Sequence, residues 1–148
     1  MTTTYIPTED HLIRNVPWAR LRKDADDNVV GILGAAFRLR ENERYLSASW
    51  LEFFKGSDRA KRLQAAIRVI RKSRMPPTAK SGFAIGNVGQ IVDQCVSRNR
   101  RIRVVHEPEK NNQAHVAVRR WPNDDQELLE LLARDTWSEL VLNRDIPV

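Results

Sequence analysis

Short apolar runs that end at turn-forming residues predict the strands of a sheet. The first run covers His11–Val16 and stops before Pro17, which cannot continue a strand ladder. The most regular stretch covers residues 29–49, where two extended runs flank the polar turn Glu41–Arg44 and predict a hairpin. Further strands are expected at residues 82–86, 100–108 and 114–122, the last two as an antiparallel pair.

Three other stretches repeat their apolar residues every three or four positions, as one buried helix face requires. Ser57, Asn87 and either Asn123 or Asp124 are the expected N-caps, and Pro76 ends the first helix. The helices are expected at residues 57–74, 87–99 and 123–142. The elements predict an α+β fold, with one mixed or mostly antiparallel sheet of about five or six short strands covered by about three helices. We expect a single domain over residues 1–148.

The composition is typical of a folded protein, because 41% of the 148 residues are hydrophobic and 30% are charged. No run approaches the roughly 18 apolar residues of a membrane span, and the start lacks the features of a secretory signal. We therefore expect a cytoplasmic protein without a membrane partner. A lone cysteine, Cys95, allows neither an internal disulfide nor a cysteine-based zinc cluster. No metal and no cofactor are expected, and homo-oligomerisation stays open.

The excess positive charge lies in the middle of the chain. Residues 55–105 carry 13 basic and 2 acidic side chains, whereas residues 106–148 carry 5 and 9. Such a block usually faces an anion, because Arg and Lys neutralise phosphates and release counterions. We expect nucleic acid, a nucleotide or an acidic protein partner to bind the basic residues of the first helix: Arg59, Lys61, Arg62, Arg68, Arg71 and Lys72. In the alternative interpretation, the acidic last third of the chain covers this charge.

The turn at Gly86–Gly89 is a second candidate anion site. A strand that ends at Gly86 and a helix that opens at Asn87 would present free backbone N–H groups, so that Asn87 and Gly89 seat one phosphate. The segment lacks the Walker and dinucleotide glycine patterns. A tight strand-to-helix turn explains the same residues.

Side chains suited to proton transfer form a third group. Ser47 and Ser49 share one face of their expected strand, while His106 and His115 flank the loop of the last strand pair. The alternative function is therefore a small nucleotide-handling or group-transfer enzyme centred on Ser47, His106 and His115. Two other interpretations explain the same residues. One is a metal site formed by these histidines, with His11 joining them, and Glu107 or Glu109. The other is ordinary hydrogen-bonded histidines.

Several short motifs occur in an order that resembles an uncharacterised family of small bacterial proteins. They are Ala36–Arg40 (AFRLR), Leu46–Ser47, Trp50–Phe54 (WLEFF), Asn87–Gly89, His106–Pro108 and His115. The family's aromatic segment ends like WLEYF, whereas this chain has Phe53–Phe54 and no tyrosine hydroxyl there. The resemblance covers residues 11–137 and implies family membership, but no established activity.

Arg14, as a candidate for the early arginine, together with Ser47 and Ser49 also loosely resembles the arginine and serine positions of ADP-ribosyltransferase-type folds, although no suitable glutamate follows. The first expectation for function remains a cytoplasmic binding or accessory protein. Proteins of this kind accompany larger partners in bacterial mobile-element or antiviral defence cassettes. Its rivals are the enzyme centred on Ser47 and a protein–protein adaptor subunit that uses aromatic contacts.

Overall fold

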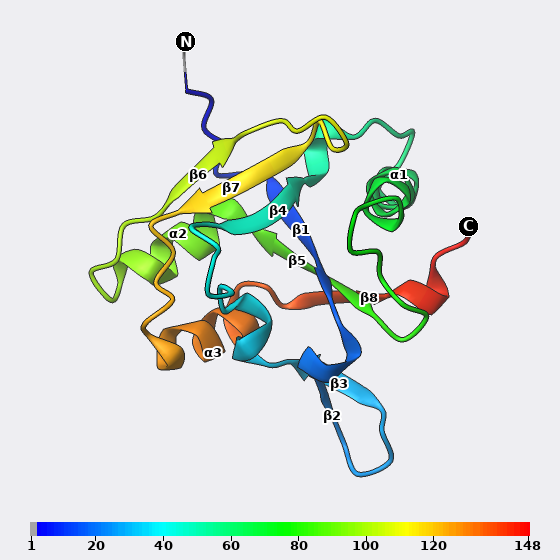
Figure 1. The fold of residues 1–148 in the computed structure, drawn as a ribbon, viewed down its shortest axis with the longest axis horizontal. Coiled ribbons are helices and arrows are strands. Elements are labelled where there is room, and N and C mark those ends of the chain that lie inside the picture. The colour runs from blue at the N-terminus through cyan, green and yellow to red at the C-terminus, as the bar shows by residue number, and fades with distance from the viewer. Residues whose placement is uncertain (1–2) are drawn as a thin grey trace.

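The computed structural model describes residues 3–148 and contains one six-stranded antiparallel sheet (Figure 1). In sheet order the strands are β6 (Arg103–His106), β7 (His115–Arg119), β4 (Leu46–Trp50), β1 (His11–Val16), β5 (Gly82–Asn87) and β8 (Glu139–Leu142). Two further strands, β2 (Leu21–Lys23) and β3 (Val29–Ile32), form a separate hairpin. The α+β class and the antiparallel main sheet are thus confirmed.

Helices cover both faces of the sheet. Helix α1 (Arg59–Arg71) packs on one face against Ile13, Phe83 and Ile85. Helices α2 (Val88–Val96) and α3 (Gln126–Asp135) lie on the opposite face (Figure 1). Asp58, Asn87 and Asp125 accept hydrogen bonds from the first turns of these helices, so the predicted cap at Asn87 is confirmed and the other two lie one or two residues from those predicted.

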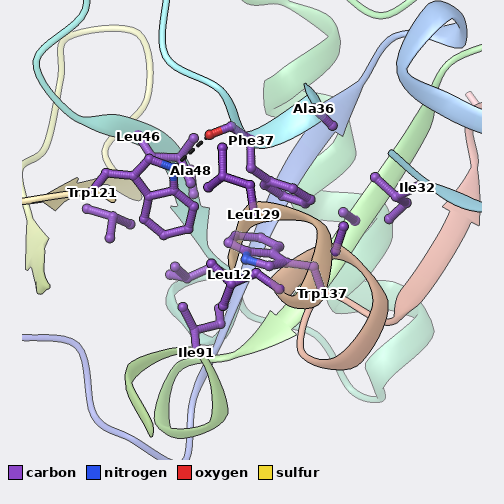
Figure 2. Packing of buried hydrophobic residues seen from close by; sticks show 14 of the residues in the cluster. Leu12, Ile32, Ala36, Phe37, Leu46, Ala48, Ile91, Trp121, Leu129 and Trp137 are labelled. Carbon is purple, nitrogen blue, oxygen red and sulfur yellow. Dashed lines mark hydrogen bonds between the residues drawn. The ribbon is translucent and has the colours of Figure 1, made fainter. Parts of the chain in front are cut away.

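The larger core lies between the sheet and the α2–α3 layer. Trp137 is fully buried there, and its ring centroid lies 4.9 Å from that of Phe37 (Figure 2). The indole nitrogen of Trp121 donates to the Phe37 carbonyl at 2.7 Å, which ties the segment before β4 to the segment before α3. Burying large aromatic side chains of this kind supplies much of the hydrophobic stabilisation of a small core.

The predicted hairpin over residues 29–49 is wrong. Residues Gly34–Phe37 form a 3-10 helix, residues 38–45 are irregular, and β4 pairs with β1 and β7. The backbone groups of residues 37–39 are bonded elsewhere, because Asn123 Oδ1 accepts from the Leu39 N–H at 2.6 Å and the Trp121 indole occupies the Phe37 carbonyl. Side chains near the start of α3 therefore replace the expected strand partner.

The last strand is a second correction. The helical spacing predicted one helix over residues 123–142, but α3 ends at Asp135 and β8 adds to the edge of the sheet beside β5. The Thr136 hydroxyl donates to the Leu132 carbonyl at 2.9 Å, and the Trp137 N–H bonds to the same carbonyl, which closes the final turn. Within residues 3–148, no helix has the length and apolarity needed to cross a membrane.

Candidate functional site

Three of the six basic side chains predicted to bind an anion donate hydrogen bonds to groups of the protein itself. Arg59 makes a bidentate ion pair with Glu139, with N–O distances of 2.5 and 2.6 Å. The Arg62 Nε donates to the Phe54 carbonyl at 3.0 Å. Arg71 holds the end of the chain, since it donates to both oxygens of Asn143 and to the carbonyls of residues 146 and 147. These three arginines bond to acceptors of the protein itself, although the Arg59 side chain is still 50% exposed.

The other three cations form a single exposed line, which we call the α1 stripe: Lys61, Arg68 and Lys72. Steps of seven and four residues place them within about 40° of one another around the helix axis, at rises of about 10.5 and 6 Å. All three are exposed, and within the described part of the chain none has a hydrogen-bond or ion-pair partner for its charged group. The stripe lies opposite the buried residues of α1, such as Ala66 and Ile67.

The helical spacing distinguishes the three hydrogen-bonded arginines from the α1 stripe. Arg59 lies four residues before Leu63, and Arg71 lies four residues after Ile67, so both flank the buried face of α1. Side chains at such positions reach neighbouring elements. The α1 stripe occupies the remaining third of the circumference.

Two arginines of the loop after α2 are paired with acids and so do not add to the α1 stripe. Arg98 donates to Asp125 at 3.0 Å and Arg100 pairs with Asp124, so acids of the last third cover this part of the positive block. The donation from Arg98 also holds the pKa of the Asp125 carboxyl below its usual value. The alternative interpretation, in which the acidic last third covers the charge, therefore holds for Arg59, Arg98 and Arg100 but not for the stripe.

The backbone N–H groups at the start of α2, which were expected to be free, also donate hydrogen bonds within the protein. The Val88 N–H donates to the Asp10 carbonyl at 2.9 Å, and the Gly89 N–H donates to the Thr8 carbonyl at 3.0 Å. The Asn87 side chain caps the Gln90 N–H at 2.9 Å. The expectation of an open phosphate seat at Asn87 and Gly89 is wrong, because the N-terminal segment fills it.

Two of the three predicted catalytic side chains lie together on the sheet. Ser47 Oγ is 2.5 Å from His115 Nε2, and the other ring nitrogen, Nδ1, is 2.9 Å from the Glu107 carbonyl oxygen. The pair joins adjacent strands, because Ser47 of β4 lies opposite Ala117 of β7, two residues along from His115. His115 is only 4% exposed, whereas Ser47 is half-buried.

The remaining histidines lie elsewhere. His106 pairs with Val116, which faces the α2–α3 core, so its side chain is on the opposite face of the sheet from His115. Its Nε2 lies 2.7 Å from the Gln113 carbonyl. His11 Nδ1 is 2.7 Å from Glu52 Oε2. The predicted catalytic trio thus reduces to a pair, and within residues 3–148 no group of three or more potential ligands could hold a metal ion.

Arg14 supports the backbone of Ser47. The β1–β4 ladder covers Leu12–Trp50 and Ile13–Ser49, and just beyond it Arg14 Nη1 donates to the Ser47 carbonyl at 2.6 Å. The same guanidinium donates twice to the Ala36 carbonyl. Burial lowers the Arg14 pKa to about 10, so the group stays cationic at neutral pH.

Sequence reasoning named Glu107 and Glu109 only as possible metal ligands beside the histidines, and it missed Asn112 and Arg119. The loop between β6 and β7 brings Glu109 Oε1 within 3.8 Å of His115 Nε2, and Asn112 donates to Ser49 Oγ at 2.9 Å. Glu107 makes a bidentate ion pair with Arg119. The sequence signal was a polar loop flanked by histidines and glutamates, which predicts that these residues lie near one another but not how they are bonded.

One hollow of about 540 Å³ lies between the β2–β3 hairpin and α3, and none of the predicted site residues lines it. Comparisons with protein-family models, curated proteins and solved structures give no match. The resemblance to a family of small bacterial proteins stays a prediction. Conclusions about function therefore rest on the geometry of the α1 stripe and of the Ser47–His115 pair.

Proposed function

We propose that this protein binds a phosphate-rich polymer, with nucleic acid as the first choice, through the α1 stripe. The observation that supports the proposal is the exposed line of three cations without acidic partners among the described residues. Asp58 is the only acid in the same helical segment, and its side chain caps the Lys61 N–H.

The stripe is electrostatically unfavourable without an anion. Two unit charges about 6 Å apart repel by about 0.7 kcal/mol in water, and more beside a protein surface of lower dielectric. Neither Arg68 nor Lys72 has an acid three or four residues away on the helix that would offset this repulsion. A row of phosphates removes the repulsion and releases its own counterions.

The geometry also sets the size of the effect. The stripe spans about 16 Å along α1, which exceeds the roughly 3.4 Å axial rise between phosphates of one DNA strand, so each cation meets a different phosphate. Three contacts give a slope of about −2.7 for log affinity against log salt on duplex DNA. Affinity then falls about 40-fold between 50 and 200 mM salt.

The test compares two triple variants that change net charge equally. Lys61, Arg68 and Lys72 are replaced by Glu in the first, and the exposed Arg20, Arg101 and Lys110 in the second. Affinity for duplex DNA is measured at low salt, with circular dichroism to confirm folding. We expect the stripe variant to lose binding and the control variant to keep most of it.

Equal losses in the two variants would show that net charge alone attracts DNA, and the stripe would not be a site. Capture of an acidic protein by the wild type but not by the stripe variant, without DNA binding, would replace nucleic acid by the adaptor alternative. The link to mobile-element or defence cassettes stays a prediction.

A further inference from the structure

The hydrogen bonds of His115 fix which ring nitrogen carries the proton. A carbonyl oxygen only accepts, so Nδ1, which lies 2.9 Å from the Glu107 carbonyl, is the protonated nitrogen of the neutral ring. Nε2 is then unprotonated and accepts a hydrogen bond from the Ser47 hydroxyl, with 2.5 Å between Oγ and Nε2. This is the arrangement that a general base needs in front of a serine nucleophile.

We propose that Ser47 and His115 form a catalytic pair that transfers acyl groups from uncharged esters, an activity separate from polymer binding by the α1 stripe. Ser47 is the nucleophile and His115 is the general base. The partly exposed position of Ser47 gives a substrate access, while His115 is only 4% exposed.

The reaction balances with water as the second substrate. Ser47 Oγ attacks the carbonyl carbon of the ester while its proton moves to His115 Nε2. The tetrahedral intermediate then breaks its bond to the leaving oxygen, which takes the proton from Nε2 and departs as an alcohol. Water, deprotonated by the same nitrogen, attacks the acyl carbon. The bond from that carbon to Ser47 Oγ then breaks, Nε2 returns its proton to Oγ, and a carboxylic acid is released.

The charges around the pair favour an uncharged acyl group. Glu109 Oε1 lies 3.8 Å from His115 Nε2, and within the described residues no cation pairs with this carboxylate. Its charge stabilises the imidazolium that forms during attack, but it repels a phosphate or carboxylate substrate. The nearby Glu107 is neutralised by Arg119, so Glu109 supplies the local charge.

Two residues position the pair without touching a substrate. Arg14 fixes the Ser47 carbonyl at 2.6 Å, and Asn112 anchors the loop by its bond to Ser49. Tyr45 packs edge-on against His115, with ring centroids 5.8 Å apart. The titratable and charged groups facing His115 are thus Glu109, the Glu107–Arg119 pair and Tyr45.

The test uses two assays on the full chain. In the first, a fluorophosphonate labels an activated serine, whose oxygen attacks phosphorus and displaces fluoride. The second measures turnover of p-nitrophenyl acetate. We expect one label, mapped by peptide mass spectrometry to Ser47 and absent in Ser47→Ala. His115→Gln should slow labelling at least about 100-fold. Ser73→Ala, at an exposed serine just after α1, is the control, and it should be labelled at Ser47 like the wild type.

Two readouts separate catalysis from a structural role. Glu109→Gln should lower the labelling rate several-fold while the protein stays folded. The ring nitrogen shifts of His115 in an NMR spectrum should show protonated Nδ1 and unprotonated Nε2. A wild type inert to both probes, a label on another serine, or a protonated Nε2 in the neutral ring would overturn the proposal.

Discussion

Two neighbouring residues at the end of α1 should have different roles: Arg71 should stabilise the fold, and Lys72 should bind DNA. Arg71 donates to four acceptor oxygens at the end of the chain, whereas Lys72 is exposed and unpaired within the described residues. Replacing either by Gln removes one positive charge. Any difference between the variants therefore reports on contacts, not on net charge.

The contacts set the magnitude. A hydrogen bond contributes about 0.5–1.5 kcal/mol net, so four acceptors give about 2–6 kcal/mol. The lower end applies, because the carbonyls of residues 146 and 147 gain water when the chain end moves. We expect Arg71→Gln to cost about 2 kcal/mol, or about 4–8 °C in Tm for a chain of this size, and Lys72→Gln less than about 0.5 kcal/mol.

The assays are urea unfolding and amide hydrogen exchange. Exchange at Asn143, whose N–H bonds to the Ser81 carbonyl at 2.9 Å, should speed up in Arg71→Gln only. DNA affinity should fall mainly in Lys72→Gln. If Arg71→Gln were as stable as Lys72→Gln, with unchanged exchange at Asn143, the assignment of Arg71 to the fold would be refuted.

Three further predictions concern the fold and its titrating groups. Gly34→Ala should cost about 1–3 kcal/mol in urea unfolding, because its Cβ would lie 2.8 Å from α3 backbone; Gly31→Ala, with only 3.8 Å contacts, is the control and should cost much less. The hydrogen bonds from Arg119 lower the pKa of Glu107. The stability that this pair adds is therefore present above the ordinary carboxyl pKa and is lost as the pH falls through the lowered pKa. A loss of stability in Glu107→Gln that does not change with pH would contradict this. Burial raises the Cys95 pKa to about 11, so Ellman's reagent at pH 8 should react only after unfolding, and rapid native reaction would oppose it.

Periodicity located most elements because burial repeats with the period of each structure. The alternation in His11–Val16 and the buried run at Gly82–Asn87 appear as β1 and β5. The segment after Gly34 failed because its apolar residues pack against α3 as a 3-10 helix, with backbone bonds to side chains of residues 121–123. Such long-range partners leave no local signature.

For the candidate sites too, the sequence predicted which residues share a strand face but not which segments contact one another. Alternation correctly placed Ser47 and Ser49 on one strand face, and the polar loop placed His115 near a strand pair. Sequence could not separate His115 from His106, because the face of each histidine depends on the register between β6 and β7. Helical spacing could have separated Arg71 from Lys72, although only the structure shows what Arg71 binds.

The salt dependence of DNA binding shows most directly whether the α1 stripe binds phosphates. Affinity of the wild type is measured from 50 to 200 mM salt beside a variant with Lys61, Arg68 and Lys72 changed to Gln. We expect a slope of log affinity against log salt of about −2.7 for the wild type and near zero for the variant. A wild-type slope near zero, or equal slopes for both proteins, would contradict it.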